Sequence, residues 1–221
     1  MEPSQASEVE YLSSLLLLLA MAGWVAAALF IYRKSLAPVY PTPYPQLFSG
    51  GTVLVGIFLF MRLIGSLSEL IKSEIWGDNY WEQIKTTTES VPGLAIPLYA
   101  MLFFMVVLQT LSFAGTVFCI VLYYRKRDIF PRVLTGMFIA VEGLGVIVIL
   151  LSLMWADYSE ILTDRDLIRI FYSWGIMGLA AWYVLKSEKA KATFVLPHHS
   201  LVDHKANTIT FDFEEEEKRE P

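Results

Sequence analysis

The chain has 221 residues, of which 55% are hydrophobic and only 18% are charged, and its mean hydropathy is +0.51. Soluble domains carry about 25% charged residues, so this excess of apolar residues indicates a membrane protein. The net charge of −5 argues against a nucleic-acid-binding protein. Cys119 is the single cysteine, which excludes an intrachain disulfide and a thiolate metal cluster. We expect neither a bound metal nor a cofactor.

The sequence contains five apolar stretches that are each long enough to cross a bilayer, for which about 20 residues suffice. They cover residues 12–32, 47–70, 96–124, 133–155 and 167–185. We therefore predict an all-α fold, an integral membrane bundle of five transmembrane helices. Acidic residues precede the first stretch and Arg33 and Lys34 follow it, which is the reverse of a signal peptide. We expect this first helix to be retained.

Composition divides the chain into four parts. Residues 1–36 form an extra N-terminal helix, and residues 37–46, with four prolines in eight positions, predict an extended linker. Residues 47–196 form a four-span core, whose polar stretch 72–92 carries aromatic residues typical of the water–lipid interface. Residues 197–221 are acidic and predict a disordered tail, although the alternating pattern after Thr208 also fits one short strand.

The positions of Lys and Arg predict the orientation, because basic residues gather on the cytoplasmic side of a membrane protein. With the N-terminus outside, the outer connections hold three basic residues, which are Lys72, Lys85 and Arg165. The inner connections then hold nine, which are Arg33, Lys34, Arg125, Lys126, Arg127, Arg132, Lys186, Lys189 and Lys191. We predict N-out and C-in. The cluster at residues 125–127 either sets only this topology or binds anionic lipid headgroups.

Ionisable residues inside the spans are the strongest candidates for a functional site, because each costs about 2.5–3.5 kcal/mol at the centre of a membrane helix. Arg62 in the second span and Glu142 in the fourth are placed so that they can meet, and Arg169 lies near the outer end of the fifth span. Three interpretations stay open: a structural ion pair between helices, a site or path for an ion or polar ligand, and snorkelling of Arg62 towards the headgroups.

Small residues four positions apart, which let membrane helices approach closely, occur twice. Gly23 and Ala27 form one pair, and Gly136 and Ala140 form the other. Packing within the bundle and dimerisation both account for them.

Enzyme chemistry has little support in the sequence. We find no phosphate-binding loop, dinucleotide-binding glycine motif, nucleophile elbow or zinc-protease motif. The three histidines all fall in the tail, at His198, His199 and His204, so haem ligation by histidine within the bilayer is excluded. We expect the protein not to be an enzyme.

Three motifs carry a resemblance to a known family. Ser49-Gly50-Gly51 opens the second span, the basic run at residues 124–127 precedes Phe130-Pro131, and residues 183–195 close the core. Together they resemble the YdgK-like family of small, uncharacterised bacterial inner-membrane proteins, over about residues 47–196. The extra N-terminal helix and the acidic tail depart from that pattern, as do Thr52 and Ala190. The resemblance implies a four-span core and a bacterial inner-membrane location.

The resemblance also singles out a membrane-proximal motif, Lys191, Thr193 and Phe194. We expect the neighbouring lysines to hold this segment at the anionic inner leaflet while Phe194 inserts into the lipid. The expected function is that of a non-enzymatic accessory or scaffold protein that binds a membrane-protein partner, or a second copy of itself, through its helices or its tail. The alternatives are a small oligomeric transporter or channel that uses Arg62 and Glu142, and a protein that binds lipid in a cleft of the bundle.

Overall fold

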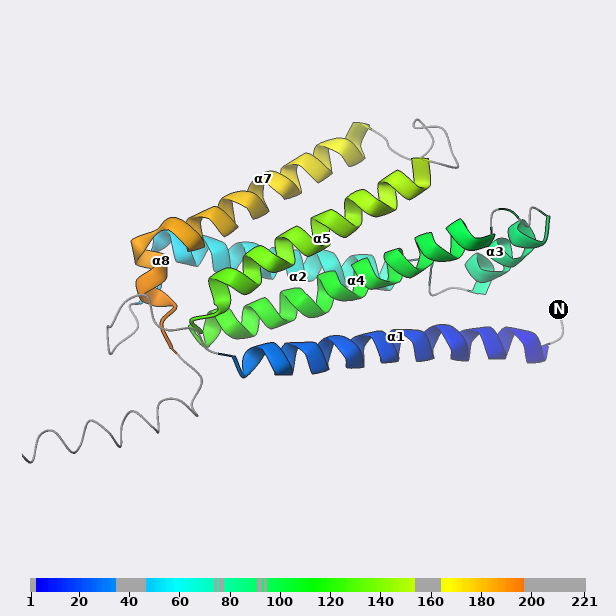
Figure 1. Cartoon of the computed structure of the whole chain (residues 1–221), viewed down its shortest axis with the longest axis horizontal. Coiled ribbons are helices and arrows are strands. Elements are labelled where there is room, and N and C mark those ends of the chain that lie inside the picture. The colour runs from blue at the N-terminus through cyan, green and yellow to red at the C-terminus, as the bar shows by residue number, and fades with distance from the viewer. Residues whose placement is uncertain are drawn as a thin grey trace, which may run out of the picture.

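The computed structural model describes a bundle of long helices with a short helix at each end (Figure 1). It describes residues 3–34, 47–73, 75, 78–90, 93, 95–153 and 164–196. The helices are α1 (Pro3–Tyr32), α2 (Gly50–Lys72), α3 (Asp78–Ser90), α4 (Ala95–Tyr124), α5 (Phe130–Leu153), α7 (Asp164–Lys186) and α8 (Glu188–Thr193). The predicted linker, the tail and the three histidines lie outside these residues.

The helix bounds follow the predicted spans with three notable differences. α1 begins at Pro3, nine residues before the predicted span. α7 begins at Asp164, three residues before the predicted span. α5 begins at Phe130, with Pro131 in its first turn, where the missing N–H of proline removes no helical hydrogen bond. Within the described residues the fold is all-helical, as predicted, and no β-strand is present.

Four of the described helices are long and apolar enough to cross a membrane. These spans are Leu15–Tyr32, Gly50–Lys72, Leu98–Tyr124 and Phe130–Leu151, with mean hydropathies of 1.9 to 2.4. Large apolar side chains such as Leu18, Leu54, Ile139 and Leu179 point outwards and are exposed. An outer surface of this kind is stable only in hydrocarbon, so the chain is a multi-pass membrane protein. α7 is not among these four helices, and four of its first six residues are charged.

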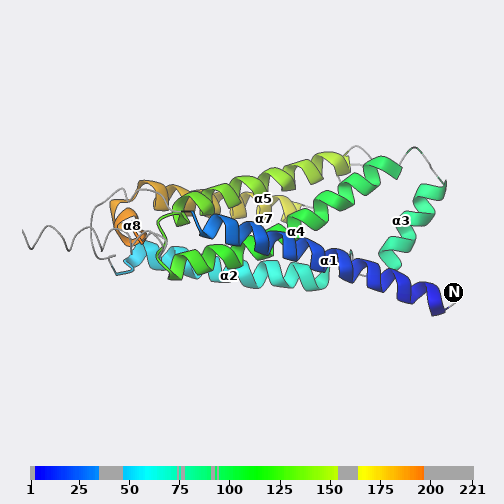
Figure 2. The ribbon, with the colours of Figure 1, turned by 60° about the horizontal axis from the view of Figure 1, so that its bottom comes forward.

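α4 is the central helix, since it packs against α1, α2 and α5, while α7 packs against α5 and α2. α3 and the N-terminal end of α1 lie at one end of the bundle, which we call the α3 end. α8 lies at the opposite end, the α8 end, and Figure 2 shows the same arrangement from a second direction. The first and last described residues therefore lie at opposite ends of the molecule.

The apolar core is concentrated in the half of the bundle nearest the α8 end. Leu122, Phe130, Val184 and Ala190 are fully buried there. A smaller cluster lies beneath α3, where Ile75 and Ile84 belong to the same buried group as Leu102 and Val106 of α4. The polar stretch that was predicted to lie at the lipid–water interface therefore contains a short helix with one apolar contact to the bundle.

The turn between α4 and α5 has a defined backbone geometry. The N–H groups of Lys126 and Arg127 donate to the carbonyls of Tyr123 and Leu122, each at 3.0 Å. Lys126 has a φ of 48°, the left-handed conformation that ends many helices in this way. Glycine is the usual residue at such a position, so Lys126 holds an uncommon backbone conformation that the surrounding contacts stabilise.

Candidate functional site

Arg62 and Glu142 meet halfway along the bundle. Each is the thirteenth residue of its helix, and both α2 and α5 begin at the α8 end, so the two side chains lie at one height. The Nη2 atom of Arg62 lies 3.7 Å from Oε1 of Glu142, and the side chains are only 13% and 19% exposed. The contact predicted from the sequence is present.

The Glu142 carboxylate also connects to α7. The side chains of Ser173 and Trp174 donate hydrogen bonds to it, so one carboxylate joins α2, α5 and α7. The hydroxyl and indole donors stabilise the Glu142 carboxylate, because burying a charge without hydrogen-bond partners costs free energy. Ser173 was not among the predicted site residues, although a serine within a predicted membrane span indicates a polar contact.

Arg62 has a wider electrostatic environment than its ion pair. Glu69, two turns further along the same face of α2, carries the opposite charge to the Arg62 guanidinium, and Cys119 of α4 is also close to it. Cys119 is buried, at 1% exposure, and its positive neighbour comes from another helix, where the chain sequence alone does not reveal it. Among the described residues, the buried Nε atom of Arg62 has no hydrogen-bond partner.

The geometry of this polar group allows two roles. A buried ion pair with further hydrogen bonds fixes the relative positions of the helices that supply it. The ion pair is nevertheless long, and one donor of Arg62 is unused among the described residues, so the guanidinium has capacity for one further acceptor. Arg169, the third predicted site residue, belongs to α7, and its side chain lies outside what the structure describes.

The α8 end of the bundle contains a cluster of aromatic rings from four segments. Phe48 stacks on Tyr123 with ring centroids 4.7 Å apart, and Phe130 lies 4.4 Å from Phe194. Phe194 is also 5.7 Å from Tyr123 and is only 4% exposed. The expectation that Phe194 inserts into lipid is therefore wrong, because the ring is buried inside the protein.

The rest of the membrane-proximal motif supports this buried ring. Thr193 is 1% exposed, and its hydroxyl donates to the Lys189 carbonyl at 2.8 Å. Beyond it, Leu196 pairs with the α4–α5 turn through two backbone hydrogen bonds of 3.1 Å, to Lys126 and from Asp128. Lys191 is half-buried on α8. The motif thus closes the α8 end of the core.

Arg127 in the basic cluster is buried rather than available to lipid. Its Nη2 atom donates hydrogen bonds to the backbone carbonyls of Tyr32 at 3.0 Å and Lys34 at 3.1 Å. Its guanidinium also lies over the Tyr32 ring, 4.9 Å from the centroid, and 3.9 Å from the Asp128 carboxylate. A cation at the C-terminal end of a helix satisfies carbonyls that have no helical partner. Arg127 therefore fixes the end of α1 to the four-helix core.

The three motifs that carry the family resemblance meet at this end. The Tyr183 ring occupies the space where a side chain on Gly51 would lie, which explains the glycine. The Tyr123 hydroxyl donates to the Thr52 carbonyl at 2.9 Å, directly beside the start of α2. Residues from the helix opening, the basic turn and the closing segment are therefore parts of one packed unit.

No group of three or more His, Cys, Asp or Glu side chains that could hold a metal ion occurs within the residues that the structure describes. Outside the ion pair, the remaining feature of note is an apolar groove between α1 and α4, which is lined by Gly23 and Ala27 among others. At Gly23, an added side chain would meet nothing within 4 Å. Within the chain, α1 and α4 therefore do not pack closely at this glycine and leave a groove there, whereas dimerisation through Gly23 and Ala27 stays a prediction.

The fold and the site define a helical multi-pass membrane protein with a polar contact at the centre of its core. The chain belongs to the family described as "Protein of unknown function (DUF2569)", and the match covers residues 45–195. This bears out the expectation of an uncharacterised family, whereas the narrower YdgK-like assignment stays a prediction. The match spans α2 to α8 and leaves α1 outside. No curated protein and no solved structure matches the chain.

Proposed function

We propose that α7 is a fifth transmembrane helix and that the protein sits N-out and C-in in a bacterial inner membrane. The uncharged part of α7, residues 170–185, is about 24 Å long, somewhat less than the ~30 Å hydrocarbon layer. Ser173 and Trp174 support the same placement, because their partner Glu142 lies halfway along α5.

The distribution of charge supports the orientation. Basic side chains surround the α8 end, and those of Arg33, Arg125, Arg132, Lys186 and Lys189 are exposed there. A ring of cations at one end of a membrane bundle is typical of the cytoplasmic side. In this orientation residues 197–221 form a cytoplasmic tail.

Within that membrane the protein acts as a non-enzymatic accessory or scaffold protein. The observation that carries this proposal is that the charged side chains in the core bind other groups of the same chain. Arg62 and Glu142 bind each other, and Arg127 caps α1, so the charges in the core are engaged in contacts between helices. The bundle presents an apolar surface outwards and has an additional helix outside the family match, and the sequence that follows it is acidic. Such features suit binding to another membrane protein.

Purification in a mild detergent tests this proposal. The full chain and a variant that ends at residue 196 are isolated from the native membrane after cross-linking, and the captured proteins are identified by mass spectrometry. A scaffold that uses its tail loses a specific partner on truncation, and one that uses its helices keeps it. If neither the full chain nor the truncated variant captures a specific protein, the result would contradict the proposal.

A small oligomeric transporter or channel is the second candidate, and the unused Nε atom of Arg62 favours it. If the pair with Glu142 opens, the guanidinium at mid-height becomes a binding position for an anion or a polar solute. Five helices without an inverted repeat make a small transporter, so this function requires a dimer. Flux of protons or anions into liposomes, compared between the wild type and Arg62→Lys, tests it. Equal flux at the level of empty liposomes would rule it out.

A further inference from the structure

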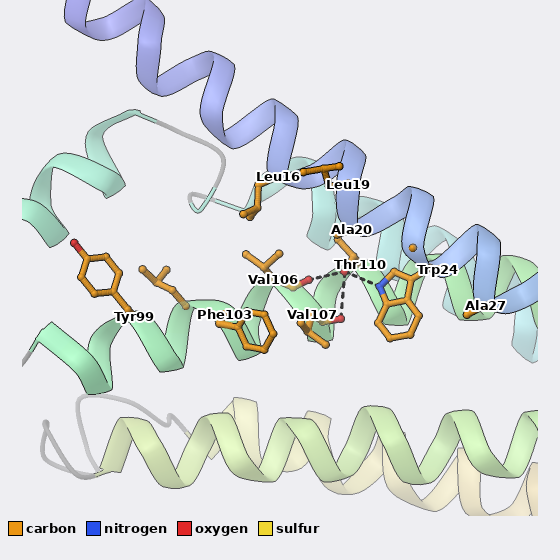
Figure 3. A pocket seen from close by; sticks show the side chains of 12 residues that line it. Leu16, Leu19, Ala20, Trp24, Ala27, Tyr99, Phe103, Val106, Val107 and Thr110 are labelled. Atoms are coloured by element: carbon orange, nitrogen blue, oxygen red, sulfur yellow. Dashed lines mark hydrogen bonds between the residues drawn. The ribbon is translucent and has the colours of Figure 1, made fainter.

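The groove between α1 and α4 is a feature that the ion pair and the aromatic cluster leave unexplained. Figure 3 shows it, with Leu16, Ala20 and Trp24 on the α1 side and Phe103, Val106 and Thr110 on the α4 side. Its volume is about 520 Å³, and its lining is almost entirely apolar. Both helices are membrane spans, so the groove lies within the hydrocarbon layer.

Contacts at the inner end keep α1 in place without filling the groove. Trp24 Nε1 donates a hydrogen bond of 3.0 Å to Thr110 Oγ1, which joins the two walls of the groove (Figure 3). The Thr110 hydroxyl in turn donates to the Val106 carbonyl at 2.7 Å. The polar atoms at this end therefore satisfy one another. Further along, Arg127 holds the end of α1, so the two walls are fixed before any ligand binds.

The dimensions of the groove select among the groups that could occupy it. Its α4 wall runs from Tyr99 to Thr110, a helix length of about 17 Å, which is roughly half of the hydrocarbon thickness. A membrane-spanning partner helix needs about 20 residues, or about 30 Å, and would extend well beyond this wall, whereas one acyl chain spans a single leaflet and matches the length of the wall.

We propose that this groove is a binding site for one acyl chain of a membrane phospholipid from the leaflet at the α3 end. Lipid tails are as apolar as leucine, so affinity over the surrounding bilayer comes from packing against two fixed walls rather than from escape from water. Gly23 keeps the middle of the groove open, since an added side chain there would meet nothing within 4 Å. This site is independent of the accessory function proposed above.

Native mass spectrometry of the full chain in a mild detergent tests the proposal. We expect one phospholipid to remain bound per chain in the wild type. Gly23→Leu fills the groove and should reduce the bound fraction at least tenfold. The matched control is Gly136→Leu on α5, where an added side chain also meets nothing within 4 Å and which does not line the groove. This control should retain the lipid.

Ala27→Leu provides a second variant for the same space if Gly23→Leu fails to fold, because Ala27 lines the groove from the next turn of α1. Thermal unfolding of each variant verifies that lipid loss does not reflect loss of structure. Four results would overturn the proposal: equal phospholipid retention in all variants, binding of detergent alone, a free fatty acid as the bound mass, or a mass equal to a second protein chain. A failed partner capture with retained lipid would contradict the accessory function alone.

Discussion

Replacing Arg127 by alanine should detach α1 from the four-helix core and lower the stability of the whole protein. The guanidinium makes two hydrogen bonds to the carbonyls of Tyr32 and Lys34, at 3.0 and 3.1 Å, and covers the Tyr32 ring. Hydrogen bonds from a charged donor contribute about 1.5–3 kcal/mol each, and a cation–π contact about 0.5–2 kcal/mol. Water can reach carbonyls at a helix end, so we expect a net loss of about 3 kcal/mol.

Thermal unfolding in detergent measures this loss. For a chain of this size 1 kcal/mol corresponds to about 2–4 °C, so the midpoint should fall by about 6–12 °C. Arg125→Ala is the matched control, because it removes one positive charge from the same turn, and its side chain is exposed. We expect it to change the midpoint by less than about 2 °C, as exposed substitutions change stability by about 0.5 kcal/mol or less. Equal shifts for the two variants would refute the anchoring role of Arg127.

Two further predictions concern the core. Arg62→Leu should destabilise the protein by about 3–5 kcal/mol by leaving Glu142 buried without its cation, and adding Glu142→Leu should recover most of that loss. Chemical denaturation in mixed micelles measures both, and a double variant no more stable than the single one would disprove a structural pair. Gly51→Ala should cost about 1–3 kcal/mol because its methyl group would overlap the Tyr183 ring, whereas Gly50→Ala, with open space, should be neutral. The same assay compares them, and equal stabilities would contradict this packing.

The sequence was sufficient to predict the helices, because long apolar stretches have few stable conformations in a bilayer other than spanning helices. It also predicted the contact between Arg62 and Glu142, since charges at similar depth in hydrocarbon stabilise each other. The burial of the Arg127 side chain against the end of α1 could not be predicted in this way. A basic residue beside a span is equally suited to the lipid headgroups and to the end of another helix. Its acceptors, the carbonyls of Tyr32 and Lys34, are more than 90 residues away in the chain.

The burial of Phe194 could not be predicted from its neighbours in the sequence either. A phenylalanine after a lysine-rich segment fits the lipid interface, and only the folded chain brings Phe48, Tyr123 and Phe130 together to surround it. The groove at Gly23 was missed for a related reason. Small residues permit close approach of helices without requiring it, and the tilt of α1 against α4 depends on distant contacts such as Trp24 with Thr110.

The number of membrane crossings is the central claim, and topology mapping tests it most directly. Single cysteines are placed at Ser4 and at Ser200 in a Cys119→Ala background and labelled in intact cells with a maleimide that does not cross membranes. Five crossings with the N-terminus outside predict labelling at position 4 only, with position 200 reacting after the cells are opened. Labelling of both positions in intact cells, or of neither, would place the two ends on one side and contradict a fifth transmembrane helix.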